Sequence, residues 1–398
     1  MNIVNMKLLL FFCLLFSCAN ESQHTQIEKS EIIVAAEQLD LYLTKLKDKN
    51  VAIVANQTST IGKEHLVDKL IAKDIQIRKV FAPEHGFRGK ADAGELIKSG
   101  VDTKTGLPII SLYGKNKKPT KDQLSEIEIV LFDIQDVGVR FYTYISTLHY
   151  VMEACAKNNI PLIVLDRPNP NAHYIDGPIL EPDYKSFIGM HPVPIVYGMT
   201  IGEYAQMIKG EAWIAKSDNL DLTIIPCRNY DHKTIYELPI KPSPNLPNLK
   251  SILLYPYLCF FEGTNVSVGR GTNKQFQVIG NPIFKNEKLY HFTPLPNEGA
   301  KYPKLENQQC FGDDLSAKEE QSLFKNANLD LSYLLEYAAF FKAKNEPFFL
   351  ENLFFDKLAG TSKLREDILA GKTEHDIKAS WKEDISSFKK IRKKYLIY

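Results

Sequence analysis

One loop of the sequence carries a carboxyl group that is well placed for acid–base chemistry. Residues 82–89 read Ala-Pro-Glu-His-Gly-Phe-Arg-Gly, so Glu84 lies between a proline and a glycine-rich turn. Proline fixes the backbone of such a loop and glycine allows it to turn sharply. Glutamate is a common general acid or base, and we predict an active site centred on Glu84. His85 beside it is either a structural histidine or a group that orients the carboxylate.

Three further polar clusters each follow a predicted β-strand, at residues 56–59, 133–140 and 166–170. The carboxyl ends of parallel strands share one edge of a sheet, and ligands bind in the crevice outside that edge. We therefore expect these clusters to meet the Glu84 loop at one rim. Taken singly, an asparagine here could form a turn and an aspartate could cap a helix. The candidates for ligand contacts in these clusters and the Glu84 loop are Asn56, Gln57, Arg88, Asp133, Asp136, Arg140, Tyr142, Asp166 and Arg167.

A second candidate carboxylate, Glu262, follows two phenylalanines and precedes a glycine. An acid set in a partly apolar wall is suited to proton donation, so Glu262 is the first candidate for a partner of Glu84. Arg270 lies between two glycines, which let the backbone approach a ligand closely. Asn265 is a further candidate for a ligand contact. The alternative is a tight hairpin that carries a surface acid and a surface arginine.

The first half of the chain alternates short apolar runs with amphipathic stretches. This alternation is typical of parallel βαβ units in an α/β fold, with helices on both faces of the sheet. From about residue 210 the chain becomes rich in proline and glycine loops, which indicates a second, smaller α+β domain. We predict a catalytic domain over residues 35–215 and an auxiliary domain over 216–398, with the last residues packed back on the fold. Strands are predicted at 51–54, 75–81, 108–112, 127–132, 161–165 and 222–226, and a long helix at 139–157.

The N-terminus has the features of a secretory signal. A lysine precedes a short apolar run at residues 8–16, and Leu-Phe-Ser-Cys ends at Cys18. The run is too short to span a bilayer as a mature helix, and a cysteine at this point looks like a bacterial lipobox. We expect a lipoprotein signal at residues 1–18, lipidation of Cys18 and a tether at 19–34, which would anchor the protein in the cell envelope. The alternative is a plain signal peptide with an incidental cysteine.

Charge and missing motifs argue against several classes of protein. A formal net charge of +1 over 398 residues offers no electrostatic footprint for nucleic acid. The glycine signatures of nucleotide sites are absent, as are GxSxG and HExxH, and we predict no cofactor and no metal. Four later cysteines have no CxxC spacing. Although they could pair in three ways in an oxidising compartment, we predict buried free thiols at Cys155, Cys227, Cys259 and Cys310.

A series of motifs, in one linear order from about residue 35 to the C-terminus, resembles that of the bacterial exo-β-N-acetylmuramidases, long catalogued as a domain of unknown function. The resemblance implies a Rossmann-like catalytic domain, an auxiliary C-terminal domain and a cleft between them. It also implies removal of non-reducing terminal N-acetylmuramic acid from peptidoglycan fragments, as in cell-wall turnover and recycling. One departure is Tyr197, where a histidine or a basic residue would be expected before the glycine. The motifs are Asn56-Gln-Thr-Ser, Pro83-Glu-His-Gly-Phe-Arg-Gly, Ser111-Leu-Tyr-Gly, Asp133-x-Gln-Asp-Val-Gly-Val-Arg-Phe-Tyr-Thr-Tyr, Asp166-Arg-Pro-Asn-Pro, Pro242-Ser-Pro-Asn-Leu-Pro and Phe261-Glu-Gly-Thr-Asn-x-Ser-x-Gly-Arg-Gly-Thr.

Hydrolysis of a glycosidic bond needs an acid for the leaving oxygen and a second group that supplies or activates the nucleophile. We assign the first role to Glu84 and the second to Glu262, with Asp133 and Asp136 in reserve. The N-acetyl group of the substrate is an alternative nucleophile. A bidentate arginine suits the lactyl carboxylate of such a substrate. The candidates are Arg88, Arg140 or Arg270 for the carboxylate, Asn56, Gln57 and Asp166 for the hydroxyl and N-acetyl groups, and Tyr142 and Phe261 for stacking on the sugar ring.

Two other functions are compatible with the sequence. The first is a lipid-anchored protein that binds muropeptides without turnover. The second is a metal-dependent phosphatase or amidase, in which Asp133, Asp136, Asp166 and His85 would bind Mg²⁺ or Mn²⁺ through hard oxygen ligands. Turnover of a disaccharide and activity after chelation distinguish these functions from a glycosidase.

Overall fold

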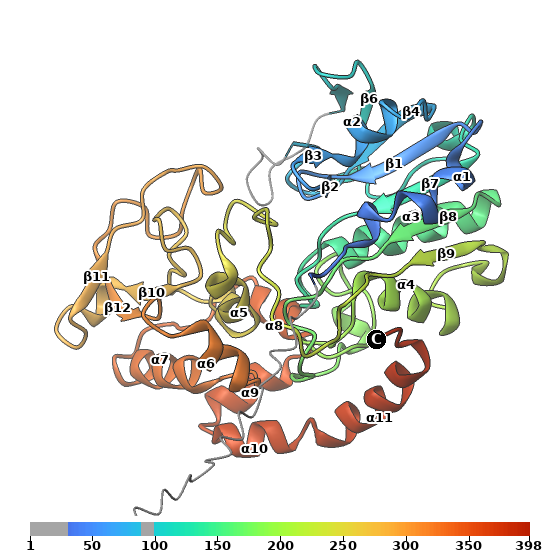
Figure 1. Ribbon diagram of the computed structural model, residues 1–398. Helices are drawn as coiled ribbons and strands as arrows, with labels where there is room; N and C mark the ends of the chain where they lie inside the picture. The colour runs from blue at the N-terminus through green and yellow to red at the C-terminus, as the bar shows by residue number, and fades with distance from the viewer. Residues whose placement is uncertain (1–30, 89–98) are drawn as a thin grey trace, which may run out of the picture. The chain divides into compact units, whose positions relative to one another are not determined.

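A seven-stranded sheet forms the centre of the N-terminal part of the fold (Figure 1). The computed structural model describes residues 31–88 and 99–398. The strand order is β5-β6-β4-β1-β7-β8-β9, and neighbours are parallel except for β5, which pairs antiparallel with β6. The strands are β1 (Val51–Ala55), β4 (Ile77–Ala82), β5 (Gly100–Val101), β6 (Pro108–Ser111), β7 (Ile129–Asp133), β8 (Leu162–Leu165) and β9 (Leu222–Ile225), and a small hairpin joins β2 (Thr60–Ile61) to β3 (Glu64–His65).

Helices cover both faces of this sheet, as the apolar runs of the sequence predict. Ala52 and Val54 belong to the core cluster that contains α3 and α4, whereas Val51, Ile53 and Ala55 pack with α1 and α2. Strands that are buried on both faces read as continuous apolar runs. The α/β fold is therefore confirmed. The helices are α1 (Leu43–Leu46), α2 (Leu66–Ile71), α3 (Tyr144–Asn158) and α4 (Ile201–Gly210).

The chain changes direction across the sheet at β1. From β1 it proceeds to β4 and β6 on one side, and it then crosses to β7, β8 and β9 on the other. Ligands of open α/β sheets bind at such a switch point, outside the carboxyl ends of the strands. The loops after β1 and β7 meet here, because Asn56 donates a hydrogen bond of 2.9 Å to the hydroxyl of Tyr144.

The helix after β7 begins at Tyr144, five positions later than the Val139 predicted from the sequence. Gly138 has a φ of 76°, and a Cβ at this position would collide with the side chain of Asn169. Arg140 points into the interior, where it donates to main-chain carbonyls. The apolar residues at 137–143 therefore pack as a buried turn rather than as a helical face.

The C-terminal part contains a three-stranded antiparallel sheet of order β10-β12-β11 and several helices (Figure 1). Strand β9 belongs to the large sheet, so the segment that builds this sheet extends to Ile225, beyond residue 215. Residues 32–398 form one compact unit. The elements are α5 (Leu249–Leu258), β10 (Val278–Asn281), β11 (Tyr290–Phe292), β12 (Cys310–Asp314), α6 (Glu320–Lys325), α7 (Ser332–Ala343), α8 (Phe354–Ala359), α9 (Lys363–Leu369), α10 (Glu374–Ala379) and α11 (Lys382–Arg392).

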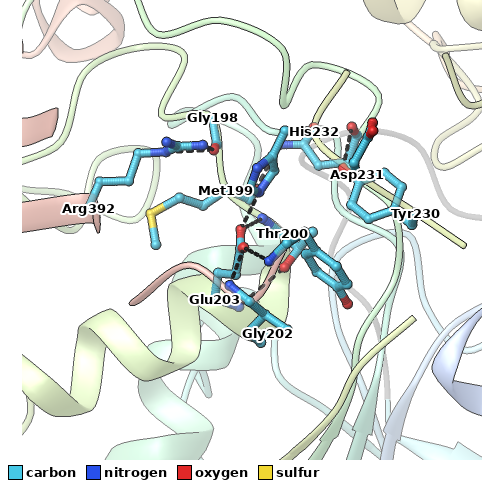
Figure 2. A network of polar contacts seen from close by, with 12 residues as sticks. Gly198, Met199, Thr200, Gly202, Glu203, Tyr230, Asp231, His232 and Arg392 are labelled. Carbon is cyan, nitrogen blue, oxygen red and sulfur yellow. Dashed lines mark hydrogen bonds and ion pairs between the residues drawn. The ribbon is translucent and has the colours of Figure 1, made fainter. Parts of the chain in front are cut away.

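The last residues of the chain pack back on the N-terminal part of the fold, as predicted. The amide of Ile397 donates to Glu203 over 2.8 Å. Figure 2 shows the other contacts of Glu203, whose second oxygen lies 2.8 Å from Nε2 of His232. In the same view Arg392, at the end of α11, donates to the carbonyl of Gly198 over 2.8 Å. These contacts attach the C-terminal segment to α4 and to the loop that precedes it.

At the N-terminus, the part of the chain that the structure describes begins at residue 31. The predicted signal at residues 1–18, with Cys18, and the tether up to residue 30 lie outside the described residues. Ile33 forms an isolated β-bridge with Arg228, so a residue before the predicted domain start at residue 35 also contacts the fold. Among the residues that the structure describes, no helix combines the length and the apolar character needed to cross a bilayer.

The prediction of buried free thiols is confirmed for all four later cysteines. Each is buried and unpaired with another cysteine. Burial raises the pKa of Cys155 to about 12, so this thiol stays protonated at physiological pH. These cysteines are part of the core.

Candidate active site

A cavity of about 730 Å³ lies at the carboxyl edge of the large sheet. Part of its wall comes from the loops after β4, β6, β7 and β8. The rest comes from the segment before α5, from α5, from the 3-10 helix Cys259–Gly263 with the loops that follow, and from α8. The cavity therefore contains residues of both the N-terminal and the C-terminal parts. The predicted residues that line it are Glu84, His85, Tyr142, Glu262 and Arg270.

Glu84 is held in this cavity by two hydroxyl groups. It lies two residues beyond β4, in a turn closed by a 3.0 Å hydrogen bond from the amide of Gly86 to the carbonyl of Pro83. Oγ1 of Thr143 donates to Oε2 of Glu84 over 2.7 Å, and the hydroxyl of Tyr113 also bonds to this carboxyl group. Burial and the charge of Glu84 raise the pKa of Tyr113, so the phenol remains neutral. Because hydroxyls donate and accept, they can hold Glu84 as a carboxylate or as an acid.

His85 occupies an unusual backbone conformation beside Glu84. Its φ is 68°, and that of Gly86 is 76°. Left-handed φ values are uncommon for residues other than glycine, and they persist only where the surrounding structure imposes them. The side chain of His85 is buried and lines the cavity. The turn thus directs both the carboxyl group of Glu84 and the imidazole towards the same space.

Glu262 lies in the 3-10 helix that follows α5, and it forms an ion pair. Its Oε1 lies 2.9 Å from Nη1 of Arg270. Phe261, which was predicted to stack on the sugar ring, packs in the core instead of lining the cavity. The sequence did not predict the ion pair of Glu262. Nζ of Lys304 donates to the carbonyls of Phe261 and Glu262, over 3.0 and 3.2 Å, and to that of Thr264. Burial lowers the pKa of Lys304 to about 8. Lys304 therefore braces the turn that carries Glu262.

Gln57 shapes a wall of the cavity without lining it. Its Nε2 donates to the carbonyl of Pro242 over 3.0 Å, and the hydroxyls of Tyr142 and Tyr144 donate to the same oxygen over 2.9 and 3.2 Å. The chain then runs into Ser243 and residues 245–246, which line the cavity. The polar residues after β1 thus fix the position of a distant segment.

Other residues of the cavity were not singled out from the sequence as ligand contacts. Tyr113 and Thr143 belong to the quoted motifs, and each follows a strand of the large sheet, so their position in the sequence was a usable signal. Lys304 comes from a loop with no recognisable motif. The additional polar and aromatic residues of the lining include Tyr113, Thr143, Ser243, Asn245, Tyr255, Tyr302 and Lys304.

The remaining predicted contacts lie outside the cavity lining. Arg140 is fully buried and donates to four main-chain carbonyls. Arg88 pairs with Asp102 over 2.8 Å, and Asn265 donates to the carbonyl of Pro347 over 2.7 Å. Of the three arginines considered for the substrate carboxylate, Arg270 is therefore the one that lines the cavity. The residues placed elsewhere are Asn56, Gln57, Arg88, Asp133, Asp136, Arg140, Asp166, Arg167 and Asn265.

Asp133 and Arg167 form a bidentate ion pair in the interior. Nε and Nη2 of Arg167 lie 2.5 and 2.8 Å from the two oxygens of Asp133. Both side chains are almost inaccessible, with 3% of the surface of Arg167 and 0% of that of Asp133 exposed. Asp133 is the last residue of β7, and Arg167 follows the neighbouring strand β8. The two strand ends thus bind each other instead of lining the cavity.

Asp136 and Asp166 are also engaged inside the fold. Asp136 accepts hydrogen bonds from the amide of Gly138, over 2.7 Å, and from the hydroxyl of Tyr197. Tyr197, the departure from the family motif, is thus an interior residue. Burial raises the pKa of Asp136 to about 6. Over residues 31–88 and 99–398, no three His, Cys, Asp or Glu side chains form a group that could hold a metal ion.

The charge of Asp166 should affect stability. Its Oδ1 accepts from the amides of Arg167 and Gly202 over 2.9 and 2.8 Å, and its Oδ2 lies 2.7 and 2.8 Å from the hydroxyls of Thr200 and Tyr398. Because hydroxyls also accept hydrogen bonds, a protonated carboxyl group fits here.

Burial raises the pKa of Asp166 from 3.8 to about 7, so the folded state binds a proton that the unfolded state has released. The free energy of unfolding should fall as pH rises from about 4 to about 7. Urea titrations should show this slope flattened in Asp166→Asn, and an unaltered slope would contradict the assignment.

An α/β fold whose cavity presents two carboxyl groups among aromatic side chains has the components of a glycoside hydrolase. The chain belongs to the exo-β-N-acetylmuramidase NamZ family. Residues 51–250 match the N-terminal region of this family, and residues 253–398 match its C-terminal region. The resemblance inferred from the motifs is thereby confirmed.

Individual relatives agree with this assignment. The chain is 40% identical over 374 residues to the peptidoglycan β-N-acetylmuramidase NamZ of Bacillus subtilis (strain 168), and the match covers 90% of this chain and 89% of that protein. A crystal structure of a DUF1343 family protein from Bacteroides fragilis NCTC 9343 is 45% identical, with a TM-score of 0.85, over 93% of this chain and 99% of that one. A second DUF1343 family protein from the same organism is 27% identical, with a TM-score of 0.75, over 92% and 99%.

Proposed function

We propose that this protein is an exo-β-N-acetylmuramidase, which hydrolyses non-reducing terminal N-acetylmuramic acid from peptidoglycan fragments. The observation that carries the proposal is one cavity that contains both Glu84, held by two hydroxyl groups, and Glu262, paired with Arg270. The name of the Bacillus subtilis relative supports the same substrate. Release of terminal sugars from wall fragments serves cell-wall turnover and recycling.

Glu84 is the proposed acid and base of the reaction. As an acid it gives its proton to the glycosidic oxygen while the bond from this oxygen to the sugar C1 breaks. The oxygen of a water molecule forms the new bond to C1, and one proton of this water passes to a carboxylate. The second group is either Glu262, from the C-terminal part of the chain, or the N-acetyl oxygen of the substrate. His85 is positioned next to Glu84 in the same lining.

Arg270 is the proposed partner of the lactyl carboxylate, which distinguishes muramic acid from glucosamine. Its guanidinium lines the cavity and is already fixed by Glu262 and by the carbonyl of Gly299, which accepts from Nη2 over 3.1 Å. A planar guanidinium can bind two carboxylate oxygens at once. Tyr142 and Tyr255 supply aromatic surface in the same cavity.

The function is tested directly with a defined disaccharide, N-acetylmuramic acid β-1,4-linked to N-acetylglucosamine. The purified protein should convert it into the two monosaccharides, detected by mass spectrometry. Tight binding of the intact disaccharide without turnover would identify a binding protein instead. Loss of activity after exhaustive chelation, with recovery on addition of Mg²⁺ or Mn²⁺, would identify a metal-dependent hydrolase.

Replacing Arg270 should affect the charged substrate selectively. Hydrogen bonds to charged groups contribute roughly 1.5–3 kcal/mol, so Arg270→Ala should lower kcat/KM on a chromogenic muramic acid glycoside by about 10- to 100-fold. Arg270→Lys keeps the charge but loses the planar fork, and it should recover only part of this activity. Hydrolysis of the corresponding glucosamine glycoside, which has no lactyl group, should fall less, because this substrate is affected only through the lost ion pair of Glu262. Equal losses on both glycosides would contradict the proposed contact.

We also propose that the protein is exported and held in the cell envelope by a lipid on Cys18. The proposal rests on the short apolar run and the cysteine that follows it. Mass spectrometry of the mature protein would test it. An unmodified N-terminus that begins after residue 18 would contradict a lipid anchor.

A further inference from the structure

Tyr302 combines two properties that are rarely found together. It lines the cavity that contains Glu84 and Glu262, yet 90% of its surface is exposed. The other aromatic residues of the lining include Phe141, Tyr142 and Tyr255, all of which are buried. Among the large hydrophobic side chains that are exposed in the described part of the chain, Tyr302 is the one aromatic residue. Packing inside the protein therefore does not account for this side chain.

The backbone around Tyr302 is held by contacts to the catalytic cavity. Lys304, two residues on, is bound to three carbonyls of the turn that carries Glu262. The carbonyl of Gly299, three residues before, accepts from Asn245 over 2.7 Å and from Arg270 over 3.1 Å. Both flanks of Tyr302 are thus attached to cavity residues. Because the backbone is held, only the two χ angles of the tyrosine remain to be ordered when a ligand packs on the ring.

The reaction proposed above determines which part of a substrate can reach this ring. An exo-acting enzyme encloses the terminal sugar, so the remainder of the glycan must leave through the mouth of the cavity. A residue that lines the cavity and is also almost fully exposed lies at that mouth. Its contact is therefore with the sugar beyond the cleaved bond, not with the enclosed muramic acid.

The chemistry of a tyrosine ring suits this role. A pyranose presents C–H groups on its flat faces, and an aromatic ring offers an apolar surface with a polar hydroxyl at its edge. N-Acetylglucosamine, the sugar that follows N-acetylmuramic acid in the disaccharide, has such a face. A neutral stacking contact also accepts longer glycan fragments, because it reads a ring face and no charge.

We propose that Tyr302 is a specificity-determining residue that stacks on the leaving N-acetylglucosamine unit. This inference rests on the proposed exo-muramidase function and goes beyond it, because it assigns the site for the part of the glycan that is released. Tyr302 contacts substrate but takes no part in proton transfer. It should increase the preference for glycan substrates over the free terminal sugar.

The test compares Tyr302→Ala with wild type on two ligands that differ at the leaving side. Loss of the ring contact should lower kcat/KM on the disaccharide by about five-fold. The inhibition constant of free N-acetylmuramic acid, which occupies the cavity alone, should not change. Tyr302→Phe keeps the ring and should retain most of the activity on the disaccharide. Leu289→Ala is a matched control, because Leu289 is 99% exposed and does not line the cavity.

The outcomes separate this inference from the proposed function. Failure of the wild-type protein to cleave the disaccharide would overturn the function, and with it the role of Tyr302. With cleavage established, an unchanged kcat/KM in Tyr302→Ala would overturn the stacking role alone. A parallel rise in the inhibition constant of free muramic acid, or a lower melting temperature than wild type, would also overturn it, because either result would show that Tyr302 shapes the cavity itself.

Discussion

Glu84→Gln should lower kcat on a chromogenic muramic acid glycoside by about 10²–10⁴-fold, the usual contribution of a general acid or base. The substitution preserves shape, and the amide can still bond to Thr143, which holds the carboxyl group over 2.7 Å. The variant should therefore fold normally and bind substrate with a similar affinity. Steady-state kinetics and a melting curve measure both properties.

A matched substitution separates this effect from a general response to removing a carboxylate. Glu128 lies just before β7, at the amino edge of the same sheet, and it is exposed. Its Oε2 accepts from the amide of Asn50 over 2.8 Å. Glu128→Gln should retain wild-type kcat. If Glu84→Gln keeps more than about a tenth of wild-type activity, Glu84 is not the acid or base.

Asp133→Asn should instead be a stability variant. The substitution leaves the guanidinium of Arg167 buried without its counter-charge, and breaking a buried pair in this way costs about 3–5 kcal/mol. The carboxylate bonds to Nε and Nη2 of Arg167 at 2.5 and 2.8 Å, so the full loss is expected. Urea denaturation should show the lower free energy of unfolding. The fraction that remains folded should have near-normal kcat.

Removing both charges provides the control for this prediction. Asp133→Leu combined with Arg167→Met replaces the pair by apolar groups, and it should be less destabilising than Asp133→Asn alone. One result would contradict the assignment of Asp133 to stability. A stable Asp133→Asn protein without activity would mean that Asp133 acts on the substrate, as the sequence first suggested.

The architecture of the N-terminal part was predictable because the strands of its large sheet are buried on both faces. Continuous apolar runs as short as 51–54 and 161–165, bounded by polar residues, are typical of strands in a parallel sheet with both faces covered, and both runs are strands of the sheet. The rule that ligands bind at the carboxyl edge predicted a site around Glu84, and Glu84 lines a cavity at this edge. The start of α3 was missed, because residues 137–143 are as apolar in a buried turn as they would be on a helix.

It was harder to predict which polar residues at the carboxyl edge of the large sheet line the cavity. Polar groups at neighbouring strand ends are close enough to satisfy one another, as Asp133 and Arg167 do. A sequence cannot show whether such a group faces a ligand or another side chain. Arg140 presents the same difficulty, because main-chain carbonyls that surround it come from segments as distant as residue 358.

The positions of the cavity residues in the C-terminal part could not be predicted from the sequence, because they depend on contacts between segments that are far apart in the chain. The sequence placed Glu262 and Arg270 in one motif, but their ion pair and its position opposite the sheet loops follow only from the fold. Lys304 and Tyr302 lie in a loop without a recognisable functional motif. Their roles arise from the carbonyls of residues 261–264 and from the mouth of the cavity.

A crystal structure of the Glu84→Gln variant with the intact disaccharide would show whether residue 84 lies at the glycosidic bond of a bound substrate. We expect muramic acid inside the cavity, with the glycosidic oxygen within hydrogen-bond distance of residue 84 and the lactyl carboxylate on Arg270. The N-acetylglucosamine unit should point out of the mouth and lie against Tyr302. A muramic acid bound elsewhere, or a glycosidic oxygen out of reach of residue 84, would contradict the role proposed for Glu84.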